Sequence, residues 1–221
     1  MDLSRRNALA LGAAALPAAS LALLSSRASG QEPLTEAGVL ALRDPLLAAR
    51  MLISSFKQVN KCRVALDMAT LDDTRDFLAV EIREHQTIRN ELSQLGFTYP
   101  ARRDRVGPVI MMVGRVELPP SVSDALSVEH QVAEESIDNF EEVLLQLEGA
   151  EIDRFVLADQ LFAHYMLLDA NETYARLASD AMLPLLDASL RTIRRHLTTI
   201  SGLSTRVDRL AGARIEVIPR R

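Results

Sequence analysis

Apolar residues recur every three or four positions along most of the chain beyond residue 44. This is the spacing of residues on one face of an α-helix. The pattern predicts five helical segments, which span about 45–69, 73–95, 121–147, 151–168 with a possible extension to Leu177, and 184–201. The last segment shows the pattern clearly, because its apolar positions are Leu186, Leu190, Ile193, Leu197 and Ile200.

Proline, glycine and capping residues set the expected helix boundaries. Asp44 followed by Pro45 predicts a helix start, with a capping side chain before a proline in the first turn. Residues 101–120 are rich in glycine and proline and are expected to be non-helical. Within them, residues 109–113 have strand character and could pair with residues 215–218.

The helix lengths predict an all-α fold. Four of the segments fit an up-and-down four-helix bundle. The fifth segment is either an extra C-terminal helix or part of a long helix that is kinked at Pro184. The chain has 221 residues, which is enough for one domain with a sizeable core. We expect this domain to cover residues 31–221, with its core at about 45–201.

The first thirty residues have the pattern of a secretory signal peptide. Arg5 and Arg6 precede an apolar run over residues 8–24, and the small residues Ala28 and Gly30 follow it. The paired arginines favour the twin-arginine export route, with cleavage near Gly30 and a periplasmic location. An ordinary secretory signal, or an uncleaved membrane anchor, is the alternative.

Composition narrows the functional classes. The formal net charge is −5 and only 4% of residues are aromatic, so we expect no nucleic-acid partner. Cys62 is the single cysteine in the sequence, which excludes a disulfide framework within one chain. Its neighbours Lys61 and Arg63 could lower the pKa of the thiol, but a half-buried structural cysteine is the simpler interpretation. No second apolar run is long enough to span a membrane after signal cleavage.

Polar residues occur on two of the apolar stripes. Glu81 and His85 lie four residues apart on the stripe of the second helix, and Gln160 and His164 are four apart on the fourth. We predict that these four side chains meet in the interior and form a polar network. His130 also lies on a stripe, whereas His196 is at the margin of its stripe and is expected near a helix C-terminus.

Two interpretations of the interior histidines remain open. The first is a structural hydrogen-bond network in which every buried polar group has a partner. The second is a transition-metal site, for example for zinc or copper, formed by His85 and His164 with Glu81 or Asp159. A di-iron carboxylate centre is not expected, because the Glu-x-x-His spacing is missing: Glu81 and His85 are four residues apart.

Two sequence blocks resemble a known family of exported proteins, the domain-of-unknown-function family 4142. The first block contains Phe77-Leu78-Ala79, Glu84-His85 and Gly96-Phe97, and the second contains residues 149–155 followed by Gln160 and His164. The resemblance implies a ferritin-like helical bundle without an established activity. Among the candidate site residues, the resemblance covers His85, Gln160 and His164. It departs from the family pattern after Leu183-Pro184, where the usual histidine is missing.

Three functional hypotheses follow. The first is a non-enzymatic bundle that binds a protein or envelope partner, because the sequence contains no phosphate-binding glycine loop and no nucleophile motif. The second is a transition-metal-binding protein that uses Glu81, His85 and His164. The third, an oxidoreductase on a ferritin-like scaffold, is disfavoured by the missing carboxylates.

Overall fold

The computed structural model describes residues 36–97, 112–113 and 116–215. In this part of the chain it contains five α-helices: α2 (Glu36–Met68), α3 (Asp72–Gln94), α4 (Pro120–Leu144), α5 (Ala150–Leu177) and α6 (Leu183–Ile215). The predicted all-α helical bundle is therefore confirmed. The predicted signal peptide lies outside the described residues.

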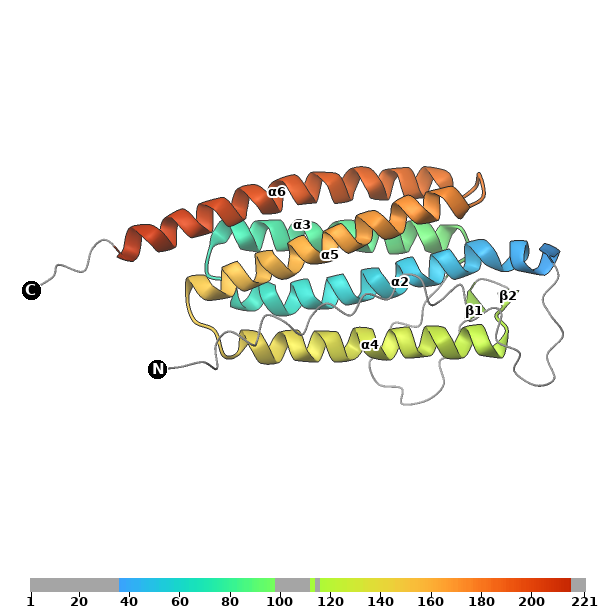
Figure 1. Ribbon diagram of the computed structural model, residues 1–221, viewed down its shortest axis with the longest axis horizontal. Helices are drawn as coiled ribbons and strands as arrows, with labels where there is room; N and C mark the ends of the chain where they lie inside the picture. The colour runs from blue at the N-terminus through green and yellow to red at the C-terminus, as the bar shows by residue number, and fades with distance from the viewer. Residues whose placement is uncertain (1–35, 98–111, 114–115, 216–221) are drawn as a thin grey trace, which may run out of the picture. The chain divides into compact units, whose positions relative to one another are not determined.

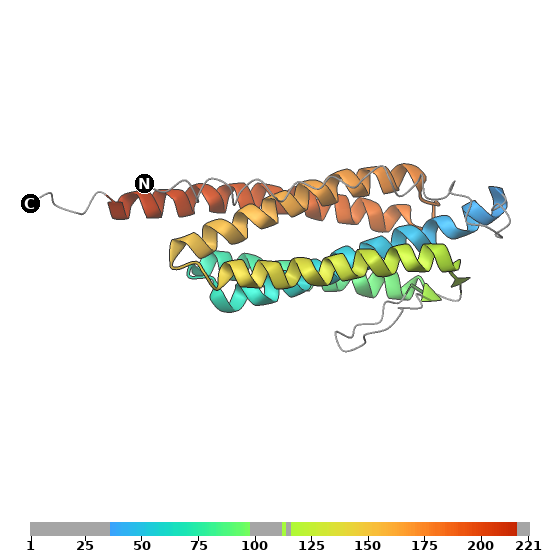
Figure 2. The same cartoon turned by 60° about the horizontal axis from the view of Figure 1, so that its bottom comes forward.

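Each helix runs opposite to the one before it in the chain, as the colour sequence in Figure 1 shows. As a result, α3 and α5 run in the same direction. Both Figure 1 and Figure 2 place α5 beside α6, and α6 also contacts α3. From Ala37 onward the chain forms one compact unit. None of the described helices is long and apolar enough to cross a membrane.

Two predicted boundaries of the first and last helices were wrong. Helix α2 begins at Glu36 and contains Pro45 in its interior. The Asp44 carboxylate does not cap the helix, because it accepts hydrogen bonds from the backbone N–H (3.0 Å) and hydroxyl of Ser179. Helix α6 continues past Gly202 to Ile215, and Val207 in this extension is buried. The extra C-terminal helix is thus separate from α5 and 33 residues long.

Two short strands lie between α3 and α4, but their pairing differs from the prediction. Strand β1 (Met112–Val113) pairs antiparallel with β2 (Val116–Glu117). Ile215, the first residue of the predicted partner segment, is the last residue of α6 and not part of a strand. Residues 109–111 and 216–218 lie outside the described part of the chain.

Aspartates tie the helix connections to neighbouring helices. The buried side chain of Asp153, in the first turn of α5, accepts hydrogen bonds from the backbone N–H groups of Thr70 and Leu71, both at 3.2 Å. It also accepts one from the Thr70 hydroxyl. Because Leu71 is the N-cap of α3, Asp153 joins the start of α5 to the start of α3.

The buried core consists of two apolar clusters with polar side chains between them. One cluster includes Leu52 and Leu186, and the other includes Leu78 and Leu157. Along α2, α3, α5 and α6, buried polar side chains occupy the positions between the two clusters: Ser55, Gln58, Glu81, His85, Gln160, His164, Ser189 and His196. The fold therefore contains a polar layer, which holds the candidate functional site.

Candidate metal centre

The carboxylate of Glu81, on α3, is the centre of this polar layer. The side chain is 0% exposed. Its Oε1 atom lies 2.9 Å from Nε2 of His164 on α5 and 2.6 Å from Nδ1 of His196 on α6. Its Oε2 atom lies 3.3 Å from Nε2 of His85, one turn further along α3. Three imidazoles from three helices therefore converge on one buried carboxylate.

A hydrogen bond to the backbone determines how His164 faces the centre. Its Nδ1 atom lies 2.7 Å from the backbone carbonyl oxygen of Gln160. A carbonyl oxygen only accepts hydrogen bonds, so Nδ1 carries the proton. In the neutral ring, the Nε2 lone pair then points toward Glu81. This is the usual arrangement of a metal-binding histidine, whose outer nitrogen donates to a carbonyl or carboxylate.

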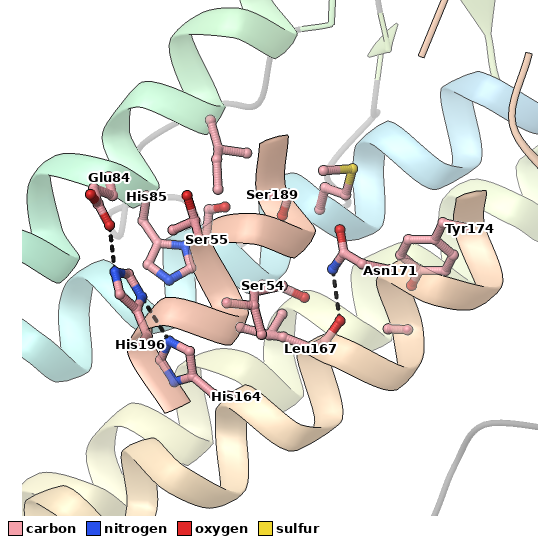
Figure 3. A pocket seen from close by; sticks show the side chains of 15 residues that line it. Ser54, Ser55, Glu84, His85, His164, Leu167, Asn171, Tyr174, Ser189 and His196 are labelled. Atoms are coloured by element: carbon pink, nitrogen blue, oxygen red, sulfur yellow. Dashed lines mark hydrogen bonds and ion pairs between the residues drawn. The ribbon is translucent and has the colours of Figure 1, made fainter. Parts of the chain in front are cut away.

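His196 connects Glu81 to a second carboxylate. Its Nε2 atom contacts Oε2 of Glu84, as Figure 3 shows, while its Nδ1 atom faces Oε1 of Glu81. The other oxygen of Glu84 accepts a hydrogen bond from Arg195 at 2.5 Å. Ionised carboxylates only accept hydrogen bonds, so this geometry fits a His196 ring that is protonated on both nitrogens.

The pKa shifts at the centre agree with that protonation pattern. Burial opposes the charge on Glu81, but its close contacts with the ring nitrogens of His164, His196 and His85 outweigh it and hold its pKa well below the ordinary value. Burial also opposes the charge on His196. Its contacts with Glu81 and Glu84 are stronger and raise the pKa of His196. The centre therefore favours an ionised Glu81 and a positively charged His196.

Three residues of the centre form a potential metal-ligand set. One ligand atom from each of Glu81, His85 and His164 lies within 4.8 Å of the other two, and all three side chains are buried. The ring centroids of His85 and His164 are 6.4 Å apart. The structure thus brings together the three residues that the sequence analysis proposed as metal ligands.

The other predicted participants have different positions. Gln160 contributes its backbone carbonyl, whereas its buried side-chain amide has no hydrogen-bond partner among the described residues, so the predicted orienting role of the side chain was wrong. Asp159 pairs with Lys61 at 2.8 Å instead of joining the histidines. His130 belongs to α4 and lies outside the centre: it is 3.4 Å from Glu134 of the same helix, and its ring centroid is 5.1 Å from that of Phe56 on α2.

His196 and Glu84 were missed by the sequence analysis. His196 lies in the middle of α6 and is 2% exposed, not near the helix C-terminus as expected. The signal was present in the sequence, because His196 is three residues after Ile193 and four before Ile200, both of which are buried. Glu84 is partly exposed, and no apolar stripe marks it.

The single cysteine is a core residue near the centre. Cys62 on α2 is 0% exposed, not half-buried as expected. Burial is the main cause that raises the pKa of its thiol well above the ordinary value, and the negative charges of Glu81 and Asp159 add to it. The positive charge of Lys61 lowers the pKa by less. The neighbouring cations therefore do not activate the thiol, and Cys62 is a structural cysteine, as the sequence analysis favoured, although more deeply buried than expected.

A pocket adjoins the histidines between α2, α3, α5 and α6. Glu84, His85, His164 and His196 line one end, and Figure 3 shows the remaining lining beyond them. The polar members of that remaining lining are Ser54, Ser55, Asn171, Tyr174, Ser189 and Thr192. The region open to the centre of a water molecule is about 20 Å³. The pocket therefore has room for water-sized ligands next to the imidazoles.

Comparison of the chain with models of known protein families gives no match, and comparisons with curated proteins and with solved structures give none either. The resemblance to the domain-of-unknown-function family 4142 and the ferritin-like topology therefore stay predictions. The case for a function depends on the geometry of the centre.

Proposed function

We propose that this protein binds one divalent transition-metal ion through Glu81, His85 and His164. The observation that carries the proposal is the convergence of the imidazole nitrogens on a fully buried carboxylate, with the outer nitrogen of His164 held by a backbone carbonyl. Two histidines and one carboxylate form the protein ligand set of several zinc and non-haem iron sites.

Proton positions at the centre are compatible with a metal ion. With its proton on Nδ1, neutral His164 presents the lone pair of Nε2 to Oε1 of Glu81 at 2.9 Å and to Nδ1 of His196 at 3.2 Å. Nε2 and Oε1 repel each other unless a proton, such as the one on Nδ1 of His196, or a metal ion lies next to both. An ion bound by Glu81 and His164 would remove this repulsion and leave both rings in their observed orientation.

The ligand types define the class of ion. Arg195 pairs with Glu84 at 2.5 Å, so the fully buried carboxylate of Glu81 is the negative group that would face the ion, together with the imidazoles of His85 and His164. Imidazole ligands favour ions such as zinc, copper or iron(II) over magnesium or calcium.

The competing interpretation is a structural network. In that version His164 carries a second proton, donates it to Glu81 and binds no ion. Both versions lose stability when His164 is removed, because a buried carboxylate loses a partner. Only the metal version also loses ion binding, so the binding measurement separates them.

The proposal is tested by calorimetric titration of chelator-treated protein with Zn²⁺. We expect one ion per chain, no comparable binding of Mg²⁺, and an affinity at least a hundredfold lower for His164→Ala. That loss exceeds the roughly 10- to 100-fold effect of removing an outer partner of a metal ligand. His130→Ala, which removes a buried histidine outside the centre, should bind as the wild type does. Absence of Zn²⁺ binding to the wild type, or equal binding by His164→Ala, would refute the proposal.

Export to the periplasm is part of the proposal and is supported by Arg5 and Arg6 before the apolar run. The twin-arginine route carries folded proteins, so it would allow an ion to be bound before export. Changing both arginines to lysine should block export, and normal export of that variant would favour the ordinary secretory route.

The hypothesis of a non-enzymatic binding protein stays a prediction. Three large apolar side chains on one face of α5 fit it, because Phe162, Tyr165 and Met166 are about half exposed, and Tyr165 and Met166 follow Phe162 by three and four residues. Metal binding and partner binding are compatible, since these side chains lie outside the buried centre.

A further inference from the structure

We infer that the metal ion has one open coordination position that faces the pocket and takes a small anionic ligand of the size of water, hydroxide or azide. This inference rests on the proposed metal site. It adds that the ion is accessible to ligands from outside the protein rather than enclosed by it.

The number of protein ligands is the first argument. Glu81, His85 and His164 supply three ligand atoms. Sites with three protein ligands keep a position for water or another ligand, whereas sites that serve only structure use four. His196 lies outside this ligand set: its Nε2 contacts Glu84, and its Nδ1 lies 2.6 Å from Oε1 of Glu81 and 3.2 Å from Nε2 of His164, so it neighbours two of the ligand atoms.

The position of the pocket is the second argument. His85 and His164 belong to its wall, so an ion that they bind lies at that wall. From His164 the pocket follows α5 to Asn171, which is two helical turns or about 10 Å further on. Small hydroxyl side chains face it from α2 and α6, at Ser54, Ser55 and Ser189, where bulky apolar side chains would fill the core.

An unpartnered polar atom in the pocket is the third argument. Asn171 is 3% exposed, and its amide nitrogen donates to the backbone carbonyl of Leu167 at 2.8 Å. Its Oδ1 atom has no hydrogen-bond partner among the described residues. A buried carbonyl oxygen without a donor is costly, and a water molecule in the pocket would supply one. Water therefore suits the polar surface of the pocket.

Size and charge define the ligand class. The space of about 20 Å³ for a water centre admits one or two water-sized groups and excludes an organic substrate. A divalent ion bound by one carboxylate, Glu81, and two neutral imidazoles keeps one positive charge. A small anion at the open position would compensate this charge.

The inference is tested with protein loaded with Co²⁺, whose visible absorption depends on its coordination. Metal binding is first measured by titration with Co²⁺ alone. Azide is then added to the Co²⁺ protein, and we expect a saturable change in the visible bands. Benzoate at the same concentrations should cause no change, because it is too large for the pocket. An equal response to benzoate would refute the assignment of the ligand to the pocket.

Variants that fill the pocket provide the second readout. Ser54→Leu and Ala170→Leu place a larger side chain in the pocket wall, away from the ligand atoms. Both should weaken azide binding at least tenfold. The matched control Ala158→Leu adds the same side chain to an exposed position on α5 and should have no effect. Unchanged azide binding in both pocket variants would overturn the inference.

The outcomes distinguish the two proposals. If Co²⁺ binds and azide leaves the spectrum unchanged, the open position is refuted while the metal site stands. If Co²⁺ and Zn²⁺ both fail to bind, the metal site is refuted, and the open position is refuted with it.

Discussion

Substitution of Asp153 by alanine should destabilise the protein more than any loss of a surface charge. Asp153 is fully buried and accepts three hydrogen bonds from the connection between α2 and α3. The donors are the backbone N–H groups of Thr70 and Leu71 and the hydroxyl of Thr70. Alanine removes all three acceptor contacts at once and leaves both backbone donors without their partner.

The magnitude follows from the number and kind of bonds. A hydrogen bond to a charged group contributes about 1.5–3 kcal/mol. Because Thr70 is exposed, water can replace part of what its groups lose, and we take the lower end of this range. The three bonds then amount to about 4.5 kcal/mol of the free energy of unfolding. With a urea m-value of about 2 kcal/mol/M, the unfolding midpoint should fall by roughly 2 M.

Urea unfolding followed by circular dichroism at the helix band measures this shift. Glu151→Ala is the matched control, because Glu151 is an exposed acid in the same first turn of α5. Its loss removes the same charge near the helix N-terminus and should cost only about 0.3–1 kcal/mol. If Asp153→Ala and Glu151→Ala unfold at the same urea concentration, the argument that the Asp153 hydrogen bonds stabilise the connection is wrong.

Further predictions concern the connection between α5 and α6, the thiol of Cys62 and the binding of Zn²⁺. Asp44→Ala removes the acceptor for two Ser179 donors and should cost about 3 kcal/mol in urea unfolding, whereas Asp180→Ala, an exposed acid nearby in sequence, should cost little. Because burial raises the pKa of Cys62, a disulfide reagent at pH 8 should label the folded protein slowly and the urea-unfolded protein completely; fast labelling of the folded protein would contradict its burial. Only the unfolded thiol ionises as the pH rises above its ordinary pKa, so this group lowers the stability at high pH, and Cys62→Ala should remove that contribution. Zn²⁺ at about 100 times its Kd should stabilise the wild type by about 2.7 kcal/mol, or roughly 5–10 °C in Tm, but not His164→Ala, and an equal shift in both would contradict the proposed ligand set.

The helices were predictable because their apolar stripes are regular, and the errors arose where tertiary contacts decide the boundary. The pair Asp44-Pro45 has the local pattern of a helix start. In the structure, the Asp44 carboxylate binds Ser179, which is far away in the sequence, and the helix begins earlier. The continuation of α6 past Gly202 is also tertiary in origin, because Val207 is buried against the apolar cluster that includes Leu78 and Leu157.

The centre was predictable in part. Glu81, His85 and His164 lie on apolar stripes, and a polar residue on such a stripe is expected to be buried with a partner. His196 was missed because the apolar stripe of α6 was taken to be centred on Leu190 and Leu197. With that centre, the histidine lies at the margin of the stripe. Glu84 had no signal of this kind, since its role depends only on where α6 packs against α3.

The hydrogen bonds of Asp153 hold the start of α5 next to the start of α3. Positions along both helices can therefore be counted from this junction. Helices α3 and α5 run in the same direction from this junction, as Figure 1 shows. Glu81 follows Leu71 by 10 residues, and His164 follows Asp153 by 11. At 1.5 Å per residue these distances are about 15 Å and about 16 Å, so the two side chains reach the same level of the bundle. Inserting one residue between Asp153 and His164 would rotate the imidazole by about 100° and move it out of the centre. The number of residues between junction and ligand is therefore as strict a requirement as the identity of the ligand itself.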